Sequence, residues 1–324
     1  MATYLVTGGC GFIGSHLCEA LIAGGANVRV LDDLSTGSAD NVPRGVPITK
    51  GDVSVPSAVV AAMDGIDGCF HLAAITSVER STEEWITTSR TNLSGTIAVF
   101  DAARRMGRKG PIPVVYASSA AVYGDCARLP IRETTRARPL SAYGADKYAC
   151  ELHARVAFRV HRVPTVGLRF FNVYGPRQDP LSPYAGVISI FSERLLAGQP
   201  INIFGDGAQT RDFVFVADVV AALLAAMEQM PQGASVFNVC TGKSTSVLDL
   251  ARLIGKLCGS QPDIRFQPLR RGEIMHSRGN DHLLRRHFEL PATTELSMGM
   301  PKTLAWMQAC RVDRGGAPSI VPMS

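Results

Sequence analysis

The sequence predicts an α/β fold: a doubly wound, mostly parallel sheet followed by a smaller C-terminal lobe. Short apolar strands alternate with helices up to Arg169, which is typical of parallel sheets with right-handed crossovers. A glycine-rich turn joins the first strand to the first helix. After Arg169, loops that contain proline and glycine mix with short helices. We therefore expect a sheet domain over residues 1–168, a substrate-binding lobe over 169–311 and a tail over 312–324, with segments near 211–240 packing back on the sheet.

Composition and charge argue against several classes of protein. The chain of 324 residues is 46% hydrophobic and 19% charged, and its formal net charge of +5 comes without a dense Lys/Arg block, so we expect no nucleic-acid partner. We expect no membrane span, because no apolar stretch is long enough, and no signal peptide, because the first strand begins at once. The eight cysteines are scattered without a C-x-x-C pair, which predicts reduced thiols, no metal site and a cytoplasmic protein.

The first strand, Tyr4–Thr7, runs into a glycine turn and then a helix that ends at Ala23. Strand, glycine turn and helix in this order are the context of a Rossmann-type dinucleotide-binding domain. Glycines let the backbone approach a pyrophosphate, and the helix N-terminus offers it free N–H groups. The spacing is G-x-x-G-x-x-G, one residue wider at its start than the usual pattern. The turn residues expected at the cofactor are Gly8, Gly11, Phe12, Ile13 and Gly14.

Acidic residues follow the next two strands. Asn27–Leu31 ends at Asp32, and an acid there accepts from the ribose 2′-hydroxyl and repels a 2′-phosphate, which favours NAD over NADP. Ile48–Val53 looks like the end of a third strand, where Asp52, followed by Val53, could meet the adenine amino group.

The fourth strand, Cys69–Ala74, is apolar and leaves the sheet through small residues, so that Ala73 allows close backbone approach. His71 lies inside this apolar run, and we interpret it as a core histidine rather than a catalyst. The stretch Thr82–Arg108 predicts one long helix, which contains Asn92.

A fifth strand, Pro113–Ser119, ends in the hydroxyls of Ser118 and Ser119, and a helix follows over Ser141–His161. This helix places Tyr143 and Lys147 on one face, one turn apart. An ammonium about 4–6 Å from a phenol favours the phenolate by roughly 3–4 kcal/mol at an effective dielectric near 20. That lowers the phenol pKa, ordinarily about 10, by about 2–3, which suits proton transfer at a substrate hydroxyl.

Two further strands, Pro164–Phe170 and Val236–Cys240, extend the pattern, and the apolar helix Asp218–Met230 is expected to pack on the sheet. In such sheets the ligand lies beyond the carboxyl ends of the strands. The candidate residues at these ends are Gly14, Asp32, Asp52, Ala73 and Ser119. Their convergence is more specific than any single motif.

Several segments are recognisable together: Thr7-Gly8-x-x-Gly11-x-x-Gly14, Asp52-Val53, His71-Leu-Ala-Ala74, Asn92-x-x-Gly95-Thr96, Ser118-Ser119-Ala-Ala-Val-Tyr-Gly124, Tyr143-x-x-x-Lys147, Leu168-Arg-Phe-Phe-Asn172-Val-Tyr-Gly175, Arg211-Asp-Phe-Val and Arg270-x-Gly-Glu273. From about Tyr4 to Met307 the chain resembles the extended short-chain dehydrogenase/reductase family, and within it the nucleotide-sugar epimerases.

The resemblance implies a role for each matching residue. Tyr143 would be the base, Lys147 would lower its pKa and bind the nicotinamide ribose, and Ser119 would bond the reacting sugar oxygen. The implied NAD contacts are Gly8, Gly11, Phe12, Ile13, Gly14, Asp32, Asp52, Val53, Ala73, Asn92, Ser118, Tyr143 and Lys147. The implied substrate contacts are Ser77, Ser119, Asn172, Ile203, Phe204, Arg211, Arg270, Glu273 and Ser277, with both arginines on the pyrophosphate, Glu273 on the uridine ribose and Ile203-Phe204 against the base.

The implied chemistry is transient oxidation of a UDP-sugar: Tyr143 takes the 4′-hydroxyl proton, a hydride passes to NAD, the 4-keto sugar turns over, and the hydride returns to its other face. Dehydratases of this family place Asp-Glu after the active-site hydroxyl, whereas Ala120-Ala121 stand here, so we reject a 4,6-dehydratase. A UDP-glucuronate 4-epimerase or decarboxylase stays open, with Arg80 as the candidate cation for the carboxylate. A non-catalytic dinucleotide sensor is less favoured, because such proteins usually lose the Tyr/Lys pair.

The resemblance also bears on the sugar and on assembly. Counted from Arg270-Arg-Gly272-Glu273, the residue facing C2′ is Ser277; a bulky Tyr there excludes an N-acetyl group and Ser or Cys admits it. This implies UDP-GlcNAc and UDP-GalNAc as substrates, with UDP-Glc and UDP-Gal as a further pair. Two stretches are similar to the N-acetyl-accepting subgroup: Ser77-Val-Glu-Arg80-Ser81, and Arg177-Gln-Asp-Pro180 leading to Pro183-Tyr184. The pair Gly279-Asn280 departs from that subgroup.

Relatives form a four-helix dimer interface from the helices at 82–108 and 141–161, which implies a homodimer.

Overall fold

A seven-stranded parallel sheet forms the centre of the larger lobe, with strand order β11-β6-β5-β4-β1-β2-β3. The computed structural model describes residues 1–106, 110–180, 186–269 and 274–313. The strands are β1 (Thr3–Thr7), β2 (Asn27–Asp32), β3 (Ile48–Lys50), β4 (Gly68–His71), β5 (Val114–Ser119), β6 (Thr165–Phe170) and β11 (Ala234–Val239). The chain reverses its direction of winding between β1 and β4, which is the switch point of a Rossmann-type sheet, as predicted.

Helices cover both faces of the sheet. One face packs against α1 (Phe12–Ala23) and α8 (Val216–Glu228), and the other against α2 (Pro56–Met63), α5 (Gly95–Met106) and α6 (Ala142–His161). Successive strand residues point to opposite faces, so Val6 packs with the first helix pair and Leu5 with the other three helices. The sheet is therefore buried on both sides, which explains the continuous apolar runs of its strands.

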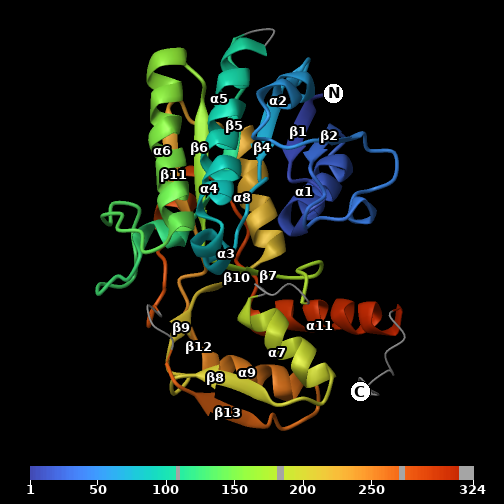
Figure 1. Ribbon diagram of the computed structural model, residues 1–324, viewed down its shortest axis with the longest axis vertical. Helices are drawn as coiled ribbons and strands as arrows, with labels where there is room; N and C mark the ends of the chain where they lie inside the picture. The colour runs from blue at the N-terminus through green and yellow to red at the C-terminus, as the bar shows by residue number, and fades with distance from the viewer. Residues whose placement is uncertain (107–109, 181–185, 270–273, 314–324) are drawn as a thin grey trace.

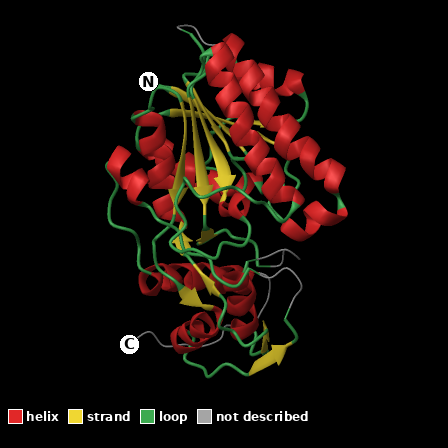
Figure 2. Cartoon of the chain, turned by 90° about the vertical axis from the view of Figure 1, so that its left-hand side faces the viewer, coloured by secondary structure: helices red, strands yellow, loops and turns green. Residues whose placement is uncertain are grey.

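The smaller lobe lies beyond the carboxyl ends of the strands, whose arrowheads point toward it (Figures 1 and 2). The smaller lobe has an apolar core of its own, which is formed mainly by α7 (Val187–Leu196), α9 (Val247–Leu257) and α11 (Leu296–Asp313). Its strand pairs are β7 (Asn172–Tyr174) with β10 (Phe213–Phe215), β8 (Ile201–Phe204) with β13 (Ile264–Gln267), and β9 (Thr210–Arg211) with β12 (Thr245–Ser246). The short α10 (His282–His287) packs against β11. Short 3₁₀ turns lie at Ala39–Asn41 and Ala120–Tyr123.

The predicted single helix over 82–108 is wrong in detail. The segment begins in the last residues of α3 (Val78–Glu83) and continues through α4 (Trp85–Ser89), a π-helical turn (Arg90–Ser94) and α5. Hydroxyl-rich sequence competes for helix carbonyls, and the Thr96 hydroxyl donates to the carbonyl of Asn92 at 2.6 Å. The Asn92 side chain is bonded elsewhere in the lobe, so tertiary contacts override the local helical pattern here. Residues 107 and 108 of the predicted helix lie outside the described residues.

Other boundaries differ slightly from the expectations. β11 comes from the second half of the chain and completes the sheet, and α8 packs on the sheet. The division at residue 168 stays a prediction. The last helix continues to Asp313, past the predicted start of the tail at 312, and residues 314–324 lie outside the described part. Among the described helices, none has the length and apolar character to cross a membrane.

Candidate functional site

The glycine turn is a close contact between backbone segments. Gly8 has a φ of +71°, and a Cβ there would lie 2.6 Å from the backbone nitrogen of Ala73. A Cβ on Gly14 would lie 2.1 Å from the carbonyl oxygen of Gly8. Both positions therefore require glycine. Gly11 is the N-cap of α1, so the first N–H groups of that helix point out of the turn without a capping side chain.

Asp32 lies beside this turn at the end of β2. Its carboxylate is buried and accepts hydrogen bonds from the backbone N–H of Cys10 and of Leu34, each at 2.9 Å. Two further acceptor positions remain on a carboxylate held in this way, which fits a ribose diol. Asp52 instead accepts from the backbone N–H of Ser54 at 2.7 Å and shapes the turn into α2, with Val53 buried beneath it.

Asn92 has a different role from the one expected. Its side chain is fully buried, its Oδ1 accepts from the backbone N–H of Ile75 at 2.8 Å, and its Nδ2 donates to the Ile75 carbonyl at 2.9 Å. Asn92 therefore holds the loop after β4, between Ala73 and Ser77, and has no exposed surface of its own for a cofactor. Ser77 is the N-cap of α3 and accepts from the backbone N–H of Arg80 at 2.9 Å.

Tyr143 and Lys147 lie in the first two turns of α6, whose N-cap Ser141 accepts from the Gly144 N–H at 3.1 Å. The Lys147 Nζ lies 5.9 Å from the centre of the Tyr143 ring. Lys147 is only 3% exposed, and its ammonium donates to the carbonyl of Ala117 at 3.0 Å. A buried ammonium needs more than one acceptor, so its remaining donors fit a ribose hydroxyl and the Tyr143 oxygen.

Ser119 ends β5. Its Oγ accepts from the backbone N–H of Ala121 at 3.1 Å, which leaves the hydroxyl proton available to a ligand. The neighbouring Ser118 points away from this site, because its buried hydroxyl donates to Glu151 Oε1 at 2.6 Å. Any contact of Ser118 with a cofactor would therefore have to come from its backbone.

A buried ion pair that the sequence did not predict lies behind Ser118. Arg169 donates from Nε and Nη2 to the two oxygens of Glu151, at 2.8 and 2.6 Å, and from Nη1 to the hydroxyl of Tyr123 at 2.7 Å. Both charged side chains are nearly inaccessible. A signal was present: Glu151 follows Lys147 by one helical turn, and Arg169 is a charge inside an apolar strand.

His71 is a core histidine, as predicted. Its Nε2 lies 3.0 Å from Thr96 Oγ1 and its Nδ1 lies 2.7 Å from Thr7 Oγ1. The Thr96 hydroxyl donates to the Asn92 carbonyl, so it accepts from the His71 Nε2–H, and Thr7 donates to Nδ1. Burial, with a smaller contribution from the Lys147 charge, lowers the pKa of His71 to about 3.

The predicted substrate residues come mainly from the smaller lobe. Asn172 is exposed at the start of β7, and Arg211 ends β9. The Ser277 N–H donates to the Thr210 carbonyl at 3.1 Å, which places Ser277 beside β9 and close to Arg211. Arg270 and Glu273 lie outside the described residues, as do Pro183 and Tyr184.

The expected contact of Ile203 with the base stays a prediction, and the burial of its side chain limits it to the backbone. Ile203 is 1% exposed and packs in the core of the smaller lobe, so its side chain has no surface for a base. The alternation of side chains along β8 turns Phe204 to the other face, where it is partly exposed.

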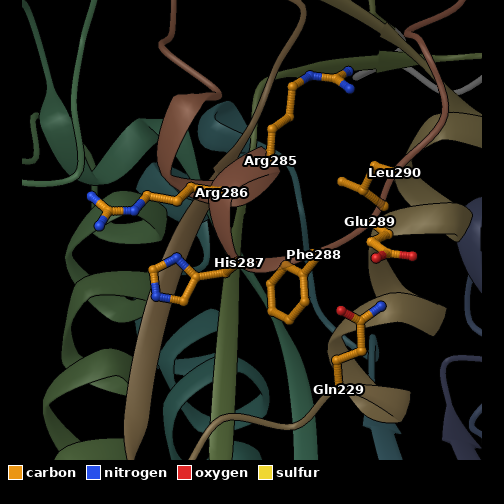
Figure 3. A pocket seen from close by; sticks show the side chains of 7 residues that line it. All are labelled: Gln229, Arg285, Arg286, His287, Phe288, Glu289 and Leu290. Atoms are coloured by element: carbon orange, nitrogen blue, oxygen red, sulfur yellow. The ribbon is translucent and has the colours of Figure 1, made fainter.

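A surface depression elsewhere carries none of the predicted residues (Figure 3). It lies at the end of α8 and along α10. The side chains of Arg285 and Arg286 point in different directions there, so their charges do not converge on one ligand (Figure 3). Among the described residues, no cluster of His, Cys, Asp or Glu suits a metal ion, and all eight cysteines are free.

A Rossmann-type sheet with a glycine turn, an acid after β2 and a Tyr/Lys pair beyond β5 defines an NAD-dependent enzyme of the short-chain dehydrogenase/reductase class. The model of the NAD dependent epimerase/dehydratase family matches residues 4–240, and the chain belongs to this family. Its cofactor is NAD, and the glycine turn, Asp32 and Lys147 are the described groups that fit it.

Individual relatives agree with this membership. The chain is 37% identical over 311 residues to a UDP-glucose 4-epimerase of Mycolicibacterium smegmatis, covering 94% of this chain and 98% of the relative. The crystal structure of Thermotoga maritima UDP-glucose 4-epimerase with UDP-glucose is similar with a TM-score of 0.90 and 33% identity, over 95% of this chain and 99% of that one. The Methanobrevibacter ruminantium UDP-N-acetylglucosamine 4-epimerase is similar with a TM-score of 0.89 and 33% identity, over the same shares of 95% and 99%.

Proposed function

We propose that the protein is a UDP-sugar 4-epimerase that interconverts UDP-GlcNAc and UDP-GalNAc and also accepts UDP-Glc and UDP-Gal. The observation that supports this most is the arrangement at the carboxyl ends of the strands. Lys147 is buried beneath the ring of Tyr143 on α6, and Ser119 ends the neighbouring β5. Relatives with similar structures are named as 4-epimerases of UDP-glucose and of UDP-N-acetylglucosamine.

Each of these residues has a defined task in the proposed reaction. NAD, when bound, supplies the acceptor and then the donor of the hydride at C4′. Tyr143 takes the proton from the 4′-hydroxyl and later returns it, while the Lys147 ammonium stabilises negative charge on the Tyr143 oxygen. Ser119 donates its free hydroxyl proton to the reacting sugar oxygen. Arg211 binds the pyrophosphate, for which a guanidinium is well matched.

The choice of sugar depends on Ser277. Its backbone is bonded to Thr210, so the segment that carries it is fixed against β9, next to Arg211. A small residue at this place leaves room for the N-acetyl group at C2′. The likeness to the M. ruminantium enzyme, which is named for an N-acetylated sugar, supports the same conclusion.

The experiment compares the values of kcat/KM for the two sugar pairs in wild type, Ser277→Tyr and Ser277→Ala. The larger side chain should reduce turnover of UDP-GlcNAc by at least about tenfold through steric exclusion and spare UDP-Gal. The Ala variant keeps the space and should retain both activities. Wild-type turnover of UDP-Glc without UDP-GlcNAc, or an unchanged ratio in the Tyr variant, would contradict the assignment.

A uronate substrate is the alternative, and one observation disfavours it. The Arg80 guanidinium, the candidate partner for a C6 carboxylate, is already paired with Glu84 through Nε and Nη2, at 3.1 and 3.0 Å. Incubation with UDP-glucuronate followed by product analysis decides between the two functions. Turnover of any UDP-sugar also argues against a dinucleotide sensor without activity.

We also propose that the protein forms a homodimer through α5 and α6, which pack side by side on one face of the sheet (Figure 1). Leu152, Val156 and Val160 are each 44–65% exposed and recur every fourth residue along α6, so they form one apolar stripe. Ile97 on α5 is 37% exposed. Sedimentation should give a dimer for wild type and a monomer for Val156→Arg; a monomeric wild type would refute this assembly.

A further inference from the structure

Asp212 is a buried residue whose carboxylate contacts two segments distant in the sequence, at Thr241 and Gly242 and at Gly279. It lies between β9 and β10 and is fully inaccessible. Its Oδ1 accepts from the backbone N–H and the hydroxyl of Thr241, at 2.8 and 2.7 Å. Its Oδ2 accepts from the backbone N–H of Gly242 at 3.0 Å and of Gly279 at 3.1 Å. The carboxylate therefore receives four hydrogen bonds.

Asp212 also contacts or adjoins three segments that carry proposed substrate residues. Its backbone carbonyl accepts from the N–H of Asn172 at 3.0 Å, and Arg211 is its neighbour in the chain. Gly279 follows Ser277 by two residues, and a Cβ at Gly279 would lie 2.5 Å from the Cys240 sulfur, so this segment passes tightly over the end of β11. The contacts of one residue thus set the positions of Asn172, Arg211 and Ser277 relative to one another.

The chemistry of the donors requires an ionised acceptor. A buried carboxylate is costly unless it is hydrogen-bonded. Four donors, two on each oxygen, can all be accepted by a carboxylate but not by an amide. Burial raises the pKa of Asp212, while the bonds from Thr241, Gly279 and Gly242 act in the opposite direction. An asparagine has one acceptor oxygen, so in either orientation its NH₂ group would face two N–H or O–H donors.

We infer that Asp212 is the positioning residue of the nucleotide-sugar site, which it orders through Asn172, Arg211 and Ser277 without touching the substrate. This inference rests on the proposed function. It predicts that weakening the Asp212 contacts weakens binding of the UDP part and alters sugar choice, while NAD binding and the Tyr143 chemistry, both on the other lobe, stay intact.

The test measures the Kd of UDP by calorimetry, KM and kcat for UDP-GlcNAc and UDP-Glc, NAD content and Tm. For Asp212→Asn we expect the Kd and KM to rise by about tenfold or more, because two donors lose a charged acceptor. We expect kcat to stay within about threefold and the ratio of the two sugars to change. The matched control is Asp249→Asn, an exposed acid of the same lobe in the first turn of α9, which should leave all values unchanged.

If Asp212→Asn fails to fold, variants of Thr241 provide the same test. Thr241→Val removes the hydroxyl bond to Oδ1, together with the bond that the same hydroxyl accepts from the Lys243 N–H at 3.2 Å, and should raise KM by a few fold. Thr241→Ser keeps both bonds and should restore the wild-type KM. A lower Tm with unchanged UDP Kd, KM and sugar ratio in these variants would show a merely structural role and overturn the inference. Failure of the wild type itself to bind UDP would instead overturn the proposed function, and the inference with it.

Discussion

Acidification should destabilise this protein through His71. The folded chain keeps this side chain neutral, with a pKa of about 3, whereas the ordinary value is 6.5. Below about pH 6.5 the His71 imidazole therefore binds a proton in the unfolded chain but not in the folded chain. The free energy of unfolding consequently falls as the pH drops toward 3. Between pH 7 and pH 5 the linkage relation gives a loss of about 2 kcal/mol from this single group.

The loss can be measured as a shift in Tm. An unfolding entropy near 2.1 cal/mol/K per residue gives about 0.7 kcal/mol/K for this chain, so 2 kcal/mol corresponds to about 3 °C. We expect wild type to lose about 3 °C more between pH 7 and pH 5 than His71→Gln, with saturating NAD throughout. The amide can replace the bond to Thr96 but does not titrate.

The comparison cancels the other titrating groups, which are common to both proteins. His153→Gln is the matched control, because His153 is exposed on α6, and its loss of Tm should equal that of wild type. Equal losses in wild type and His71→Gln would show that the buried imidazole takes up its proton without unfolding, and the reasoning would be refuted.

Two further predictions concern the cofactor and the base. Tyr143→Phe should lower kcat by about 10²–10⁴, the range of a positioned acid or base, without changing NAD content; wild-type turnover by this variant would exclude Tyr143 as the base. Heat-denatured wild type should release NAD(H) and not NADP(H). Asp32→Ala should weaken NAD binding by about tenfold or more, since it removes an acceptor for the ribose 2′-hydroxyl. It should also reduce the preference for NAD over NADP, since it removes a charge that repels the 2′-phosphate. An unchanged ratio of the NAD and NADP affinities in titrations would exclude this role for Asp32.

Much of the larger lobe was predictable from the sequence, because its signals are local. Strand, glycine turn and helix follow one another within residues 3–23, and the steric demand at Gly8 and Gly14 arises within that same turn and the adjacent strand exit. The fourth-residue spacing of Tyr143 and Lys147 gives their common face on any helix. Parallel topology then brings the strand ends together, so Asp32 and Ser119 could be assigned to one edge of the sheet before the fold was known.

Only the tertiary structure decided how the polar side chains are used. The Asn92 amide is hydrogen-bonded to the backbone of Ile75, and the Ser118 hydroxyl donates to Glu151. The Ile203 side chain packs in the core of the smaller lobe. Hydrogen bonds between residues 17 or 33 positions apart leave no periodic trace in a sequence, whereas burial patterns and helical spacing do.

Asp212 is the clearest case of this difference. Its sequence neighbours suggest a strand residue beside Arg211, the proposed ligand of the pyrophosphate, yet its four donors come from residues 29, 30 and 67 positions away. The sequence determined by itself the family and the parallel sheet, and it supplied the candidates for the chemistry. The folded chain determined which polar side chains stay available to a ligand. A polar group has few hydrogen-bonding positions, and those occupied by a buried partner within the protein are no longer available.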